Sequence, residues 1–163
     1  MPRPTLHQLA ALPRTHQAKI PVEYLDDMGH MNVMWYTHLF SLGVRGLLEQ
    51  VGIDRNYIER ANAGTFALEK HIRYFREVRV GQQISIYTRL LGRHGSRFHV
   101  MQYMTNDTLV ALASTMETVS THVDLSIRRS AAMPADIAEA VDKLATLHAQ
   151  LPWPPDECGY MAP

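Results

Sequence analysis

Residues 31–52 read MNVMWYTHLFSLGVRGLLEQVG, and this stretch decides the fold class. Apolar residues recur in it at spacings of three and four, as in a helix buried along one side. They are Val33, Tyr36, Phe40, Val44, Leu47, Leu48 and Val51. Asn32 is suited to cap the start of the helix and Gly52 to end it. Gly43 and Gly46 each cost the helix about 1 kcal/mol relative to alanine, so we expect another element to pack very close to them.

The residues that follow this helix alternate between apolar and polar positions, which is typical of strands. We predict such strands over residues 65–78, 83–91, 97–105 and 109–123, separated by turn-forming residues. An earlier strand is predicted over residues 18–25, where Pro21 is tolerable at a sheet edge, and a second helix over 134–151. One long helix followed by a run of antiparallel strands predicts an α+β fold, with a curved sheet wrapped around the central helix.

Length and composition are those of one globular domain: 163 residues, of which 46% are hydrophobic and 20% charged. We place this domain at residues 18–151, between an N-terminal extension (1–17) and a proline-rich tail (152–163). Sixteen basic and sixteen acidic residues balance to a net charge of zero, which argues against a nucleic-acid partner. The single cysteine, Cys158, excludes an internal disulfide framework and a zinc site built from cysteines.

The sequence also predicts where the protein works. It contains no run of about 18 apolar residues, so we expect no membrane-spanning segment. The first 17 residues lack the uninterrupted apolar core of a signal peptide. We therefore expect a cytoplasmic protein without a membrane partner.

Residues 24–32, YLDDMGHMN, predict a tight polar turn between the first strand and the long helix. Unpaired N–H groups at the start of a helix, here from about Gly29 to Met31, can polarise a carbonyl and stabilise negative charge. A carboxylate just upstream, Asp26, can be aimed at the same carbon as nucleophile or general base. His30 or Asn32 can position that carboxylate or a water. The alternatives are structural: Asp26 or Asn32 as a helix cap, and His30 as a turn residue.

The pattern Asp26-x-x-Gly29-His30-x-Asn32, between a strand and a long helix, resembles the hotdog-fold acyl-CoA thioesterases of the 4-hydroxybenzoyl-CoA thioesterase type. The resemblance spans about residues 20–129 and includes a second motif, LEKHIRY, at 68–74. GHMNV together with LEKHIRY is most similar to the members that act on carnitine- or betaine-type CoA thioesters. The resemblance implies that Asp26 is the catalytic carboxylate. Tyr24 stands where many members carry an earlier aspartate, which leaves the local hydrogen bonding open.

Two residues of the second motif are further candidates for catalysis. Glu69 and His71 fall on one face of a predicted strand and can form an acid–base pair contributed across a dimer interface; a solvated surface pair is the alternative. Together with His30 they could ligate a metal, but alternate positions on a strand are unspecific. We therefore predict no metal and no cofactor.

The resemblance also implies a substrate with a quaternary ammonium group, which has no N–H to donate and is recognised by aromatic faces. The candidates for this role are Trp35, Tyr36 and Tyr74, with Tyr24 and Phe66 nearby in sequence. Trp35 is favoured because it lies off the apolar stripe of the helix. For the CoA phosphates, Arg128 and Arg129 are favoured over Arg93 and Arg97.

The residues and the resemblance together predict an acyl-CoA thioesterase that releases a free acid and CoA. We expect a homodimer or homotetramer, because the sheet has an edge to cover and sites of this fold form between subunits. A non-catalytic acyl-CoA-binding protein of the same fold is the first alternative, and Asp26 argues against it. A hydratase or dehydratase is the second, but its Asp-x-x-x-x-His helix motif is not found here. The acyl group and the pathway stay open.

Overall fold

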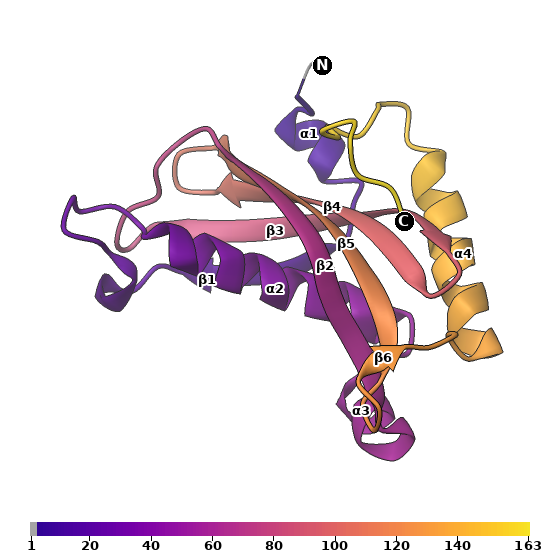
Figure 1. The fold of residues 1–163 in the computed structure, drawn as a ribbon. Helices are drawn as coiled ribbons and strands as arrows, with labels where there is room; N and C mark the ends of the chain where they lie inside the picture. Colours follow the sequence, from indigo (N-terminus) through magenta and orange to yellow (C-terminus); the bar gives the residue numbers. More distant parts are fainter. Residues whose placement is uncertain (1–2) are drawn as a thin grey trace.

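The computed structural model describes residues 3–163 (Figure 1). Its centre is one six-stranded antiparallel sheet with the order β1-β3-β4-β5-β2, in which β6 pairs with β5. The strands are β1 Arg14–Lys19, β2 Ala63–Tyr74, β3 Gln83–His94, β4 Arg97–Asn106, β5 Ala111–Asp124 and β6 Arg129–Ser130. The sheet curves around the long helix α2, Val33–Gln50 (Figure 1). The expected α+β architecture is confirmed.

Three shorter helices complete the fold. They are α1 Leu6–Leu9, α3 Arg55–Ala61 and α4 Ala135–Ala149. Apolar side chains of α2 and the sheet form one buried cluster, which includes Tyr36, Leu39 and Phe40. On the opposite sheet face, Leu9, Leu12 and Trp153 pack on Met101 and Tyr103. We call these the helix face and the outer face. No helix among residues 3–163 is long and apolar enough to cross a membrane.

Helix α2 begins and ends as its sequence predicts. The Asn32 side chain accepts a hydrogen bond of 2.9 Å from the Met34 N–H, and Gly52 follows the helix with a φ of +88°. A Cβ atom at Gly43 would lie 2.6 Å from Nε2 of Gln102, and one at Gly46 would overlap the Thr15 carbonyl. The two glycines therefore let α2 approach the sheet, which confirms the expected close packing.

The first strand differs from the prediction. It covers Arg14–Lys19 instead of residues 18–25, and Val22–Tyr24 form a 3-10 turn. Pro21, which has no N–H for a ladder, comes before this turn. The four residues from Arg14 to Gln17 thus belong to the sheet and not to the polar extension in which we placed them.

Two elements and one irregularity were not predicted. The segment between α2 and β2, for which we predicted no helix or strand, contains α3, whose start is capped by the Asp54 side chain accepting a 2.7 Å bond from the Tyr57 N–H. Strand β6 has only two residues, too few for a periodic signal. Strand β2 stops at Tyr74 and has a bulge between Ala67 and Glu69, which leaves Leu68 half exposed.

The proline-rich tail after α4 forms no helix or strand, yet it packs on the outer face with Trp153, Asp156 and Met161 buried. Arg89, in β3, holds the start of the tail by donating to the carbonyls of Trp153 and His148 at 2.8 and 2.9 Å. The His148 ring accepts a hydrogen bond from the Leu90 N–H at 2.9 Å. Burial, with a contribution from Arg89, lowers the pKa of His148, which favours its neutral form.

Candidate active site

The polar turn before α2 is closed by backbone hydrogen bonds. The Asp26 N–H donates to the His30 carbonyl and the Gly29 N–H to the Asp26 carbonyl, each at 3.0 Å. Gly29 has a φ of +81°, a left-handed conformation that favours glycine. The motif Asp-x-x-Gly-His therefore folds locally, and it brings residues 26 and 30 together.

Two groups hold the Asp26 carboxylate. Its Oδ1 accepts a 2.9 Å hydrogen bond from the Met28 N–H, and its Oδ2 lies 3.1 Å from Nδ1 of His30. The side chains of Asp26 and His30 remain 19% and 30% exposed, so a substrate or water can reach them. Asn32, not Asp26, caps α2. The interpretation of Asp26 as a helix cap is therefore wrong, and Asn32 takes the structural role.

The predicted donors for an oxyanion need correction. The Gly29 N–H bonds to Asp26, and the Met31 N–H donates to the Val78 carbonyl at 2.7 Å, so neither is free. Within residues 3–163, the N–H groups of His30 and Val33 donate to no other group of the chain. The start of α2 thus still offers two donors, but they are at different positions from the expected ones.

A depression of about 310 Å³ adjoins this turn. It is lined by His30, Met31, Val33, Tyr36, Tyr74, Phe75, Arg76 and Glu77. The rings of Tyr36 and Tyr74 form an edge-to-face pair with centroids 5.1 Å apart. Tyr36 is buried, and this burial raises its pKa to about 12, whereas Tyr74 is 46% exposed. Asp26 does not line the depression itself and is linked to it through His30.

Trp35 is less accessible than its sequence position suggested. Its ring stacks on Tyr24 at a centroid distance of 3.7 Å and an angle of 7°, which covers one face. The His38 ring lies perpendicular to it at 5.4 Å. Trp35 is also absent from the lining of the depression beside His30. Of the three predicted aromatic residues, Tyr36 and Tyr74 are the ones that the structure brings to the turn.

Glu69 and His71 lie elsewhere. In the ladder between β2 and β5, His71 faces Glu117, and its neighbour Ile72 faces Met116. Ile72 and Met116 belong to the cluster on the helix face, so His71 and Glu69 point to the outer face, because successive side chains alternate. Within one chain they are therefore separated from Asp26 by the sheet.

Arg128 and Arg129 are also distant from Asp26 in the same chain. The Arg128 guanidinium lies 5.1 Å from the centroid of the Phe66 ring. The backbone of Arg129, in β6, lies opposite that of Asp124 at the end of β5. Tyr74, at the active-site end of β2, is eight residues beyond Phe66. That separation corresponds to roughly 26 Å along a strand.

A groove of about 500 Å³, which we did not predict, lies between α2, α3 and the edge of the sheet. Its lining includes Ser41, Arg45, Lys70 and Thr118. Lys70 alternates with Glu69 and His71, so it projects to the helix face, where its Nζ lies 3.4 Å from Oγ of Ser41. Desolvation lowers the pKa of Lys70. Only the strand parity within LEKHIRY could have indicated this lysine.

Comparisons with known proteins find relatives by sequence and by structure. The thioesterase-like superfamily model matches residues 20–141. A betainyl-CoA thioesterase from Pseudomonas aeruginosa is 27% identical over 140 residues, covering 86% of this chain and 88% of that protein. An L-carnitine dehydrogenase/betainyl-CoA thioesterase from Agrobacterium fabrum is 32% identical over 131 residues. This match covers 80% of the chain but only 27% of that relative.

Solved structures share the fold. A Staphylococcus aureus protein in complex with CoA superimposes with a TM-score of 0.81 at 22% identity, covering 93% of this chain and 96% of the other. A 1,4-dihydroxy-2-naphthoyl-CoA thioesterase from Synechocystis gives a TM-score of 0.68 at 14% identity, with coverages of 78% and 94%.

Proposed function

The chain belongs to the thioesterase-like superfamily and has its hotdog fold, and on this basis we propose that it hydrolyses an acyl-CoA thioester with Asp26 as the essential carboxylate. Water is added across the thioester carbonyl, and the products are a carboxylic acid and the thiol of CoA. The observation that carries the proposal is the Asp26 carboxylate, held by the Met28 N–H and by His30 at the start of a buried helix.

The geometry supports a division of roles at the turn. Asp26, in its ionised form, attacks the carbonyl carbon or takes a proton from an attacking water. The N–H groups of His30 and Val33, at the positive end of the α2 dipole, stabilise the oxyanion. His30 positions Asp26 through its Nδ1 contact. The leaving thiolate needs no acid, because a thiol has a pKa of only about 8.5.

The activity is tested with a panel of acyl-CoA esters, with release of free thiol as the readout. Turnover of at least one ester is expected. An acyl-CoA-binding protein without activity would instead show binding by calorimetry and no thiol release with any ester, which would contradict the proposal.

The proposed acyl group carries a quaternary ammonium, as in betaine or carnitine. Two relatives are named betainyl-CoA thioesterases, which motivates this class. The depression beside His30 supports it, because the Tyr36–Tyr74 ring pair lines it. An aromatic face binds a desolvated cation with about 2 kcal/mol. Tyr74 is the half-exposed ring of the pair and the one we assign to the cation.

Tyr74→Ala is expected to lower kcat/KM for a trimethylammonium acyl-CoA by roughly tenfold, which corresponds to about 1.4 kcal/mol from one ring. A neutral acyl-CoA of similar size should be affected much less, and Tyr74→Phe should keep the preference. Trp35→Ala serves as the comparison. Because Trp35 stacks on Tyr24, we expect Trp35→Ala to lower kcat/KM for both substrates to the same extent. A selective fall in kcat/KM for the cationic substrate in Trp35→Ala, but not in Tyr74→Ala, would assign recognition of the cation to Trp35 instead.

We further propose that two chains pair through β2. This strand is at the end of the sheet order, and no strand of residues 3–163 pairs with its outer edge. An exposed edge with a leucine on it is a template for another strand. Antiparallel pairing about a two-fold axis would place the Phe66 end of one β2 beside the Tyr74 end of the other. Arg128 and Arg129 of the partner subunit would then lie near Asp26, where they can bind CoA phosphates.

The dimer can be tested with a matched pair of substitutions. Leu68, on β2, and Leu109, in the turn before β5, are both 51% exposed. Leu68→Asp is expected to shift the protein towards monomer in light scattering and to lower activity in parallel, because it places two charges at the proposed seam. Leu109→Asp should change neither. Wild type that is a fully active monomer at micromolar concentration would contradict the assembly.

A further inference from the structure

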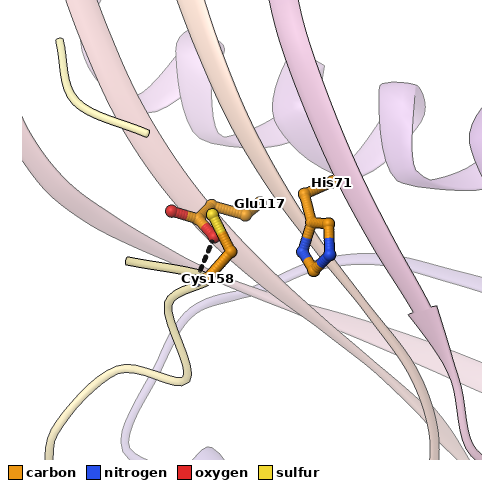
Figure 2. Close-up of side chains that lie close together, drawn as sticks. All are labelled: His71, Glu117 and Cys158. Carbon is orange, nitrogen blue, oxygen red and sulfur yellow. Dashed lines mark hydrogen bonds between the residues drawn. The ribbon is translucent and has the colours of Figure 1, made fainter. Parts of the chain in front are cut away.

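Three potential metal ligands meet on the outer face of the sheet. His71 is on β2, Glu117 is on β5 and Cys158 is in the tail (Figure 2). One ring nitrogen, one carboxylate oxygen and one sulfur lie within 4.8 Å of one another. These residues are far apart in the sequence, so only the fold brings them together. Proposed catalysis at Asp26, on the other side of the sheet, does not use them.

The surrounding contacts fix the carboxylate of this cluster. Glu117 is 1% exposed, and its Oε1 lies 2.8 Å from Nε2 of His99. Its Oε2 accepts a 2.7 Å hydrogen bond from the Cys158 N–H, which also positions the cysteine (Figure 2). His71 lies opposite Glu117 in the ladder and points to the same side. The histidine behind the carboxylate is the kind of partner that orients metal-binding groups.

The arginine on the same strand face as His71 does not neutralise the cluster. Arg73 lies on the same strand face as His71, but its guanidinium is engaged by Asp156, with Nη2 2.5 Å from Oδ2 and 2.6 Å from the backbone oxygen. This pair anchors the tail two residues before Cys158 and offsets the charge of Arg73. The negative charge of Glu117 is therefore not neutralised by this arginine.

We propose that His71, Glu117 and Cys158 bind a divalent metal ion, of which Zn²⁺ best fits a nitrogen, an oxygen and a sulfur ligand. Donor atoms around tetrahedral Zn²⁺ are about 3–4 Å apart, so the cluster has to contract slightly. His71 is exposed and Cys158 lies in an irregular segment, so both have room to do so. The thiol loses its proton to solvent on binding.

The cluster adjoins a second depression, of about 350 Å³, which includes Glu69, Glu157 and Tyr160 in its lining. A water or one of these side chains can occupy the fourth position. The bound metal would tie the tail to two strands of the sheet. Its expected effect is therefore on the stability of the folded chain and the docking of the tail, because the metal lies across the sheet from Asp26. We predicted no metal because His30, Glu69 and His71 did not form a specific site. The proposed site is a different one, made by His71, Glu117 and Cys158.

The test uses the full chain, stripped with a chelator and kept reduced. Zn²⁺ is titrated against a chromophoric chelator, and Co²⁺ is added separately to look for the absorption of a cobalt–thiolate bond. We expect one metal ion per chain, the cobalt–thiolate band, and a higher unfolding temperature with Zn²⁺. Cys158→Ser and His71→Gln should each weaken Zn²⁺ binding at least tenfold, since each removes one of three protein ligands. His94→Gln, an exposed histidine outside the cluster, is the control.

Three results would overturn the proposal. They are binding that is not stoichiometric, a Co²⁺ complex without thiolate absorption, and equal Zn²⁺ affinity in the wild type and Cys158→Ser. Equal weakening in His94→Gln would likewise show surface binding by histidines in general. All these measurements use metal binding and stability, so they do not depend on whether the chain hydrolyses acyl-CoA.

Discussion

Asp26→Asn is expected to lower turnover by roughly 10²–10⁴-fold, the usual scale for removing an acid–base group. The amide is nearly isosteric with the carboxylate, and its oxygen can still accept the hydrogen bond from the Met28 N–H. The turn should therefore keep its conformation, and the unfolding temperature should stay close to that of the wild type. The loss then reports on chemistry, because an amide neither attacks a thioester nor takes a proton from water.

Asp27→Asn is the matched control, since it makes the same change one residue away on an exposed side chain. We expect it to alter kcat only slightly. Thiol release at saturating substrate measures kcat for both variants, and circular dichroism confirms that both are folded. An Asp26 variant as active as the wild type, or a loss of the same size in Asp27→Asn, would refute the assignment of Asp26.

Gly46→Val is expected to destabilise the fold by about 2–3 kcal/mol, the upper part of the range of about 1–3 kcal/mol found for overpacked sites. Even a single Cβ at this position would overlap the backbone carbonyl of Thr15 in β1, which cannot move aside as a flexible side chain could. For a chain of this length, that loss corresponds to a drop in Tm of about 5–10 °C. A thermal melt followed by circular dichroism measures it.

Gly92→Val provides the control for this experiment. Gly92 lies in β3, does not have a positive φ, and a Cβ there would meet no atom within 4 Å. Valine also favours strands, so we expect little change in Tm. If both variants melted at the wild-type temperature, the packing of α2 against β1 would not depend on Gly46, and the explanation of the two helix glycines would be wrong.

The sequence by itself determined the main elements, because helix and strand periodicity, capping and turn formation depend on residues close together in the chain. The stripe from Val33 to Val51 gave α2 nearly to its ends. The Asp26–His30 contact could also be anticipated, since a five-residue turn with Gly29 brings the two side chains together. Composition and pattern could not show α3 or β6, which are short and have little apolar periodicity.

Tertiary structure alone decided which of the candidate residues meet. Strand parity indicated that Glu69 and His71 share a face, but which face covers α2 depends on the pairing of β2 with β5. The Met31 N–H is occupied by Val78, from a distant segment. His71, Glu117 and Cys158 converge only because β2 and β5 are neighbours and the tail folds back over the outer face. Contacts of this kind arise from long-range strand register and packing, which local sequence patterns do not encode.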